Sequence, residues 1–533
     1  MAAAEEAELL ISLSFGTIKD VELGIEEGMD TTFQELAGAD AEALLVSQIG
    51  QHAGGIRGVL ASFEVSSATS SWIETLRGIE EFINIPMFGL EDENLVCQLR
   101  AIRLDDPNWL LAHRLQIRTM LLTELAPSVV DRYLRTLTMI AVVGNGIRMR
   151  GFPCGEQLRS VDGAVEYLQS RRRQMLAFLY CMPGYCKGSQ RVEQLDALNQ
   201  FIPIVEMSCV GLTSMYRQLL LAKMHDDFVL TAGSTMCHGN YSLDTLDEMY
   251  LEPDRLSMTE VQRDKIDTGK LQGRLSLPKG QIFSAAELCN DLMTMEAMYA
   301  EFDLGTTEFG PMARFIVACS ERTQDNYHIR ISQSELNSLM SLCALSTTAR
   351  RKLVYTGDSF EEAVNSFAPF IEVAGNAVTT VTLLSRFALK WATFCLNRIK
   401  RFQIRAGFSF ETLVRNALAD QGFSIQQVKR IQYQEFDVIA LKDGVIYNVQ
   451  CKNNLLDLAR MEQNQKLFLR YNRSLDRSYA RALEKDEARE HLLLAQFGLS
   501  SVKHIVVSKF PLVTKNPRVM TYHRINEFGA RFA

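Results

Sequence analysis

The sequence predicts a multi-domain protein in which a mainly α-helical N-terminal region is followed by a C-terminal α/β domain. Three observations lead to this fold class. Apolar residues recur at spacings of three and four through much of residues 1–375. After about residue 405, strongly β-forming runs alternate with amphipathic segments. The net charge also changes sign along the chain. Residues 401–533 hold 21 Lys and Arg against 13 Asp and Glu, a net charge of +8, whereas residues 1–400 have a net charge of −16; together they give the overall −8.

The composition is that of a packed globular protein, with 533 residues of which 47% are hydrophobic. The first fifty residues contain one basic residue, Lys19, among many acids, which is the opposite of a signal or transit sequence. The longest apolar stretches, near 200–216 and 373–400, are interrupted by charged residues, so no membrane span is expected. Eleven cysteines without regular spacing are typical of reduced thiols. We therefore expect a cytoplasmic protein that does not enter a membrane.

The N-terminal region is expected to be helical over residues 1–251 and 284–404. Asp106 followed by Pro107 predicts a helix start, and Ser128 is a second N-cap candidate. Residues 252–283 are polar and contain two prolines, so they are the best candidate for a linker. From about 372 to 404 the pattern predicts a long connecting helix.

The C-terminal domain is expected to span residues 405–533. The stretch FSFETLVRNALADQGF (408–423) places apolar residues on one helical face and ends at a glycine. A strand, a hairpin, a polar and basic helical region and two further strands are expected to follow. In order these elements cover residues 424–432, 435–454, 455–496, 502–510 and 518–525. One helix, three strands, one helix and two strands are typical of a compact mixed α/β domain.

The hairpin reads EFDVIALKDGVIYNVQCKNN and carries polar residues where a core hairpin would have apolar ones. Asp443-Gly444 is a strong signal for a two-residue type I′ turn. If these residues form the turn, Lys442 pairs with Val445, which fixes the register of the whole hairpin.

This register puts Asp437 directly opposite Gln450, with Cβ atoms about 4.5–5.5 Å apart, and Lys452 on the same face. Two oxygen-bearing side chains so placed suit a hard cation, Mg²⁺ or Mn²⁺, and the Cys451 backbone carbonyl would add a further oxygen. The cation would polarise a phosphoryl oxygen and lower the pKa of a bound water. Lys452 would orient that water and stabilise the developing charge. The constellation suits hydrolysis of a phosphodiester.

A helix that bears Glu411, followed by D-x12-Q-x-K across a hairpin, resembles the PD-(D/E)XK nuclease superfamily, which has the restriction-endonuclease-like fold. The resemblance is closest to the Mrr-like branch, where Gln replaces the second acid, and covers about residues 405–533. It implies that Asp437 and Gln450 bind the metal, that Lys452 assists the nucleophilic water and that Glu411 completes the cation shell. It further implies a metal-dependent nuclease that cuts DNA rather than RNA, in prokaryotic defence against foreign DNA or in DNA repair.

The sequence also departs from the family pattern. The residue before the Asp is Phe436 rather than Pro, and Gln450 lowers the negative charge of the site. The alternative function is therefore a catalytically inactive module that keeps the fold and binds nucleic acid or a protein partner. The individual residues also have structural explanations, because Glu411 could pair with Arg415 and Asp437 could form a buried ion pair with the nearby lysine.

Five basic residues recur at spacings of three and four along the helix after the hairpin. This basic stripe would follow a phosphate backbone and give sequence-independent, salt-sensitive binding of DNA. Tyr471 and Tyr479 lie near it and could stack or simply pack. A solvated helix face is the alternative. The members of the basic stripe are Lys466, Arg470, Arg473, Arg477 and Arg481.

Two other signals are weak. Cys181 and Cys186 lie five residues apart, with Cys237-His238 as conceivable partners, which is wider than most zinc sites. Residues 331–354 loosely resemble a helix-turn-helix, with ordinary helix packing as the alternative.

The N-terminal region is expected to sense, to recruit a protein partner or to form a homo-oligomer. A purely helical signalling protein with a C-terminal scaffold is the third alternative.

Overall fold

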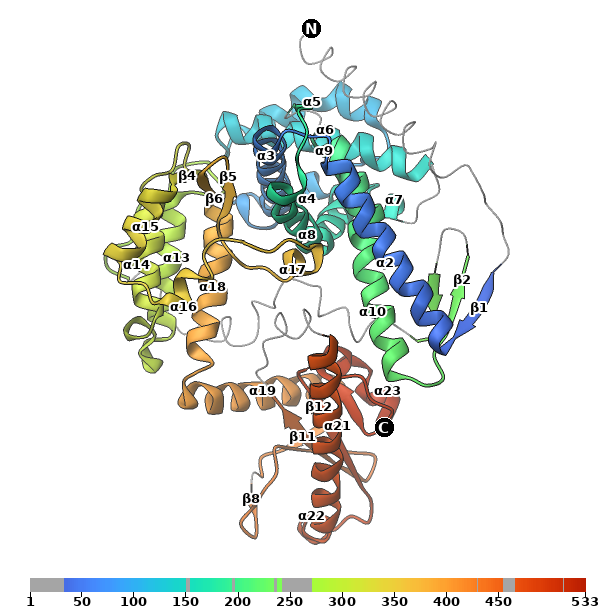
Figure 1. Cartoon of the computed structure of the whole chain (residues 1–533). Helices are drawn as coiled ribbons and strands as arrows, with labels where there is room; N and C mark the ends of the chain where they lie inside the picture. Colours follow the sequence, from blue (N-terminus) through green and yellow to red (C-terminus); the bar gives the residue numbers. More distant parts are fainter. Residues whose placement is uncertain are drawn as a thin grey trace. The chain divides into compact units, whose positions relative to one another are not determined.

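The computed structural model describes residues 33–149, 154–193, 197–233, 237–241, 271–428, 430–453, 465–510 and 512–533. The chain forms two compact units (Figure 1). The first contains residues up to Asn240, Leu271–Thr294 and Gly310–Lys390, and the second contains Met295–Phe309 and Trp391–Ala533. The continuous C-terminal part of the second unit thus starts ahead of the boundary expected at 405. Of the expected linker, residues 252–270 lie outside the described residues, and 271–283 contain no helix or strand.

Helices make up most of the first unit, as the spacing of its apolar residues predicts. α3 (Val65–Asn84) and α8 (Val161–Tyr185) pack on each other, and the rings of Trp72 and Phe178 meet edge to face at 5.7 Å between their centroids. Both rings are fully buried. The other α-helices of this unit are α2 (Gly38–Leu60), α4 (Glu93–Arg100), α5 (Pro107–Leu121), α6 (Pro127–Met149), α7 (Cys154–Gln157), α9 (Ala197–Ile204), α10 (Gly211–Met224), α13 (Ala285–Met298), α14 (Phe309–Ser320), α15 (Gln333–Leu342), α16 (Thr347–Arg350) and α17 (Phe360–Val364), with π-helical turns at η1 (Ile85–Gly89) and η2 (Val205–Val210).

The start of α5 is the one predicted, because the side chain of Asp106 accepts a hydrogen bond from the Trp109 N–H at 3.0 Å. The N-cap predicted at Ser128 is wrong. α6 begins at Pro127, whose fixed φ suits the first helical position, so Ser128 lies inside the first turn.

Two small antiparallel sheets in the first unit were not expected from the sequence. Their strands have three to five residues, too few for a clear alternation of apolar and polar side chains. One sheet has the order β1-β2-β3 and the other β4-β6-β5. The strands are β1 (Gln34–Ala37), β2 (Val229–Ala232), β3 (Cys237–Gly239), β4 (His328–Ser332), β5 (Ile371–Val373) and β6 (Asn376–Thr380).

The long helix predicted over 372–404 is wrong at both ends. Residues 371–380 form the β5–β6 hairpin, whose turn residues Ala374 and Gly375 have φ of 49° and 74°. A helix, α18 (Val381–Leu396), follows and ends before Ile399, which has extended backbone angles. Positive φ at the turn and the extended residue are both incompatible with one continuous helix.

The second unit contains a five-stranded mixed sheet with the order β13-β12-β11-β10-β7. β10 pairs antiparallel with β7 and with β11, whereas β12 pairs parallel with β11 and with β13. Because parallel strands need a crossover, the chain leaves β11 through two helices before β12. The elements are α19 (Lys400–Asp420), β7 (Ser424–Gln426), β8 (Arg430–Ile431), β9 (Gln434–Glu435), β10 (Val438–Lys442), β11 (Val445–Lys452), α21 (Gln465–Ala488), α22 (Glu490–Phe497), β12 (Val502–Ser508), β13 (Val519–Thr521) and α23 (Phe528–Phe532), with 3-10 turns η4 (Ala300–Phe302), η5 (Leu304–Thr306) and η6 (Tyr522–Glu527).

The order of elements in the second unit is the one predicted, with three local corrections. The strand expected over 424–432 is β7 alone, since β8 pairs with β9 in a separate ribbon. The helical region expected over 455–496 is described from residue 465 and is divided into α21 and α22; residues 455–464 lie outside the described residues. The last strand ends at Thr521, where the 3-10 turn begins.

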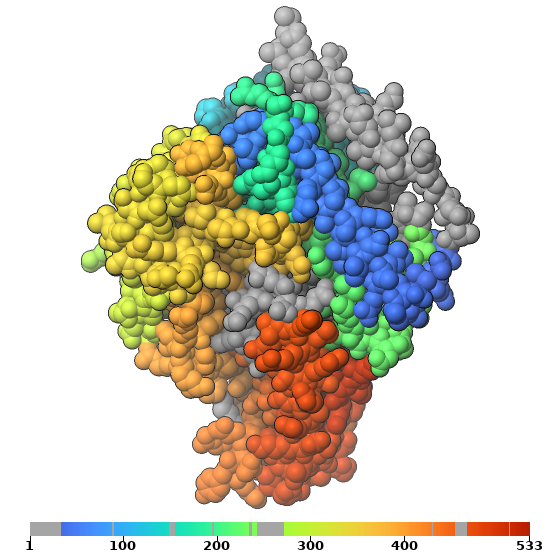
Figure 2. Space-filling model, viewed as in Figure 1, coloured from blue at the N-terminus to red at the C-terminus, as the bar shows by residue number. Residues whose placement is uncertain are grey.

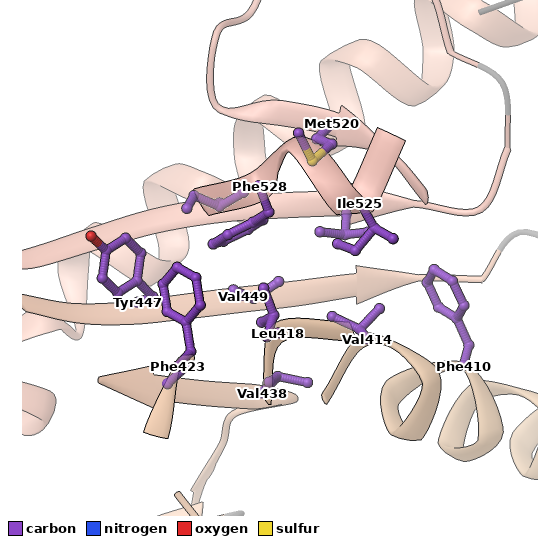
Figure 3. Close-up of a cluster of buried hydrophobic side chains, with 13 residues drawn as sticks. Phe410, Val414, Leu418, Phe423, Val438, Tyr447, Val449, Met520, Ile525 and Phe528 are labelled. Atoms are coloured by element: carbon purple, nitrogen blue, oxygen red, sulfur yellow. The ribbon is translucent and has the colours of Figure 1, made fainter. Parts of the chain in front are cut away.

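Helices cover both faces of this sheet. On one face, α19 contributes Phe410, Val414 and Leu418 to a core cluster with Val438 and Val449 (Figure 3). On the other face, a smaller cluster joins strands β10 and β11 to α22. Successive residues of each strand therefore point to opposite faces of the sheet, toward one cluster or the other. The same alternation determines to which face a polar side chain at the end of a strand belongs.

Candidate functional site

The β10–β11 hairpin has the register that the sequence predicts. Asp443 and Gly444 form its turn with φ of 51° and 77°, the two positive values that a type I′ turn requires. Lys442 pairs with Val445 across the turn, and the pairing continues along all of β10.

The next positions along the two strands hold Asp437 and Gln450. The backbone N–H of Cys451 donates to Oδ2 of Asp437 at 2.8 Å, so the carboxylate is fixed to the end of β11. The side chains of Val438 and Cys451 pack on the α19 side of the sheet, so the alternating Asp437, Gln450 and Lys452 belong to the opposite face. The structure thus brings these three residues to one end and one face of the hairpin.

Cys451 contributes its backbone to this site. Burial, and then the charges of Asp437 and Glu411, raise the pKa of its thiol well above the ordinary value, so the thiol stays protonated. Its N–H points to Asp437, and the N–H and C=O of one strand residue point to the same side. The Cys451 carbonyl therefore faces the side on which the sequence analysis expects the cation.

Asp437 and Lys452 do not form the buried ion pair that was the structural alternative. Burial raises the pKa of the Asp437 carboxyl, although the Cys451 N–H and the charge of Lys452 act in the opposite direction. Lys452 is half-buried and close enough to act electrostatically, yet among the described residues it has no ion pair within 4.0 Å. The ammonium is therefore held near the carboxylate and is not neutralised by a close contact.

Glu411 lies on α19, across the sheet from the other predicted ligands. Its carboxylate pairs with Arg415 at 3.1 Å, as the structural alternative proposed. The same Arg415 nitrogen donates to the backbone carbonyl of Asp437 at 2.5 Å, so Arg415 joins the helix to the end of β10. Glu411 is thus linked to the site through an arginine, and its role as a cation ligand stays a prediction.

Two further residues of the site, Asp486 and Arg489, were missed by the sequence analysis. Asp486 is 1% exposed, its Oδ1 accepts a hydrogen bond from Nε of Arg489 at 3.0 Å, and its charge raises the pKa of Asp437. Arg489 also covers the ring of Phe436, with its guanidinium carbon 4.9 Å from the ring centroid. The signal was in the sequence, because Asp486 falls three residues after the buried Leu483, on the apolar face of α21.

Three side-chain oxygens at this end of the sheet are buried and have no hydrogen-bond partner in the part of the chain that the structure describes. They are Oε1 of Gln450, Oδ1 of Asn453 and Oδ2 of Asp486. Each such atom costs about 1–3 kcal/mol of stability when it is left unsatisfied. Water or an ion usually meets this need, and carboxylate and amide oxygens are the ligands of Mg²⁺ and Mn²⁺. The residues present therefore fit a hard divalent cation.

A different cluster has the composition of a metal site. Within the described ranges, Glu74, Asp325 and His328 of the first unit are the group of three whose ligand atoms lie within 4.8 Å of one another. The two ring nitrogens of His328 face different carboxylates, with Nε2 2.8 Å from Glu74 and Nδ1 3.1 Å from Asp325, and Arg77 contacts Asp325 at 2.5 Å. Burial lowers the pKa of His328, but Glu74 and Asp325 together raise it more, so the net shift is upward. This geometry is that of an imidazolium held between two carboxylates.

All five members of the basic stripe are exposed on α21. In Figure 2, α21 forms a large part of the face that the second unit presents to the viewer. Tyr479 does not belong to this surface, because it is buried and its hydroxyl lies 3.0 Å from that of Ser508. Tyr471 is 37% exposed and belongs to the same helix.

The structure does not support the cysteine pair or the helix-turn-helix-like segment as functional sites. Cys181 and Cys186 are buried, and no group of three metal ligands contains them among the residues described. Burial raises the pKa of each thiol to about 12. In the segment that resembles a helix-turn-helix, the second helix, α16, has only four residues.

Comparison with known proteins found no matching family model, no similar curated protein and no similar solved structure. None of the described helices combines the length and the apolar character needed to cross a bilayer.

Proposed function

We propose that the second unit is a metal-dependent nuclease that hydrolyses phosphodiester bonds of DNA. The observation that carries the proposal is the placement of Asp437, Gln450 and Lys452 on one face at the open end of a hairpin, beside unsatisfied buried oxygens. The resemblance to the Mrr-like branch of the PD-(D/E)XK superfamily rests on the same residues. Defence against foreign DNA and a cytoplasmic location belong to the proposal. Ten of the eleven cysteines are free thiols in the structure, which supports a reducing compartment.

Each residue of the site has a distinct part in this proposal. Mg²⁺ or Mn²⁺, when bound, supplies Lewis-acid polarisation of the scissile phosphate. Asp437 and Gln450 hold the cation, the Cys451 carbonyl supplies a further oxygen, and Glu411 is the additional ligand that the resemblance implies. Lys452, which has no close acidic partner among the described residues, stabilises the negative charge that develops on the phosphate and orients the attacking water. The basic stripe holds the phosphate backbone of the substrate.

The test is the nicking of supercoiled plasmid in Mg²⁺ or Mn²⁺ by the full chain. We expect Asp437→Ala and Lys452→Ala each to lower the rate by about 10²–10³-fold, as removal of one electrostatic stabiliser of the transition state does. Asp420→Ala and Lys352→Ala remove exposed charges elsewhere and serve as controls, for which we expect the wild-type rate. Cleavage that is absent from the wild type, or that survives both changes in the site, would refute the proposal.

The second candidate is a module that keeps this fold without catalysis and binds nucleic acid or a protein partner. Two observations favour it: an amide in place of the second acid, and the engagement of Glu411 by Arg415. Salt-sensitive retention of DNA without any cleavage, unchanged by Lys452→Ala, is the result that would select this candidate.

A further inference from the structure

Asp486 is difficult to explain as a structural residue. It lies on the buried face of α21, 1% exposed, and an ionised carboxylate in such a place is stable only when its oxygens are paired. Arg489 satisfies one of them, since both contacts of its guanidinium go to Oδ1. Oδ2 is equally buried and has no partner among the described residues. A residue present only for its ion pair with Arg489 would have both oxygens satisfied.

The unsatisfied oxygen lies near the proposed cation site. Arg489, which donates to Oδ1 of Asp486, also lies over the ring of Phe436, the residue that directly precedes Asp437, with its guanidinium carbon 4.9 Å from the ring centroid. On the same helix, the hydroxyl of Tyr479 lies 3.0 Å from that of Ser508, the β12 residue that pairs with Lys452. Gln450, opposite Asp437 on the same face of the sheet, also holds a buried oxygen without a partner. Side-chain oxygens from α21, from β11 and from Asp437, which directly precedes β10, therefore lie at one end of the sheet, and two of the three residues are aspartates. Carboxylates that share a site repel each other unless a cation lies between them.

We infer that Asp486 is a ligand of the divalent cation and supplies, from the helix, the carboxylate that position 450 of the strand lacks. The inference deepens the proposed nuclease function and rests on it. Arg489 is then a positioning residue, which holds Oδ1 and leaves Oδ2 for the cation.

Metal binding to the full chain tests the inference without any measurement of cleavage. We expect calorimetric titration with Mn²⁺ in the absence of DNA to give a dissociation constant at least tenfold weaker for Asp486→Asn than for the wild type. Glu484→Gln is the matched control, because it removes one exposed negative charge from the same helix, and its affinity should stay within twofold of the wild type. Equal affinities of D486N and the wild type would overturn the inference.

A rescue experiment separates a ligand from a structural residue. Adding Gln450→Glu to D486N returns one carboxylate to the same place from the strand, so the double variant should recover most of the lost affinity. A merely structural Asp486 would not be replaced by an acid on another element. Failure of the rescue, with circular dichroism equal to that of the wild type, would therefore overturn the inference.

If D486N does not fold, the wild type provides the test. With aspartate labelled with ¹³C at the side-chain carboxyl, electron–nuclear double resonance on bound Mn²⁺ should detect two aspartates, and detection of one would overturn the inference. The two proposals fail differently. If Mn²⁺ binding depends on Asp486 but plasmid is not cleaved, only the nuclease function is refuted. If plasmid is cleaved but the affinity for Mn²⁺ does not depend on Asp486, only the inference is refuted.

Discussion

The basic stripe makes a quantitative prediction about salt. From Lys466 to Arg481 there are 15 residue steps along α21, which at about 1.5 Å per residue is about 22 Å, or six to seven phosphates of one strand at about 3.4 Å each. All five can therefore contact phosphates of the same duplex. Each contact contributes about −0.9 to the slope of log K against log salt concentration, which gives about −4.5 for the stripe.

We expect the double variant Arg473→Gln with Arg477→Gln to reduce the magnitude of this slope by about 1.8. Glutamine has a similar helix propensity, so α21 is retained. At about 0.15 M salt the same two contacts correspond to about 1.5 logarithmic units of affinity, or about 2 kcal/mol.

The assay is fluorescence anisotropy of a labelled duplex, titrated with the full chain at several KCl concentrations. Arg351→Gln with Lys352→Gln is the matched control, because both side chains are exposed cations in the first unit. An unchanged slope for the α21 variant, or an equal loss in the control, would refute the assignment of the stripe to the phosphate backbone.

Two further predictions concern the stability of the first unit. Burial, and then the charge of Asp291, raise the pKa of Glu287 to about 7, so the folded state binds a proton that the unfolded state releases near pH 4.5. As the pH rises through that window, the buried carboxyl loses its proton and increasingly destabilises the folded state. In chemical denaturation, Glu287→Gln should therefore raise the free energy of unfolding by about 3 kcal/mol at pH 8 and leave it unchanged at pH 4. The exposed control Glu372→Gln should change it at neither pH. His328 has a raised pKa, so its stabilising contribution is complete below pH 6.5 and is lost as the pH rises through the folded value. His328→Gln should accordingly lower the thermal midpoint at pH 6 more than at pH 9, and an equal loss at both would contradict the imidazolium assignment.

The parts of the site that the sequence could predict are those set by local geometry. Asp443-Gly444 defines the turn, the turn defines the register, and the register puts Asp437 opposite Gln450; each step depends on neighbouring residues alone. Asp486 could not be placed in this way. Helical spacing shows that it faces the core, but only the packing of α21 on the sheet determines which strand residue it meets. The helix predicted over 372–404 was wrong for the same reason, since tertiary contacts decided it. Ala374 and Gly375 form a turn with positive φ only because β6 pairs with β4, which is distant in the sequence.

The inferred role of Asp486 changes the meaning of Gln450. Taken alone, an amide at the second acidic position suggests a site with too little negative charge to hold a cation. With Asp486 counted, two aspartate carboxylates belong to the site besides Gln450, and the charge of Asp486 contributes to the raised pKa of Asp437. A further carboxylate at position 450 would raise that pKa more and favour protonation of one ligand over metal binding. The amide contributes an oxygen without adding charge, and the ammonium of Lys452 stays available for the phosphate. On this electrostatic reasoning, Gln450 is compatible with a working site because Asp486 supplies the second carboxylate.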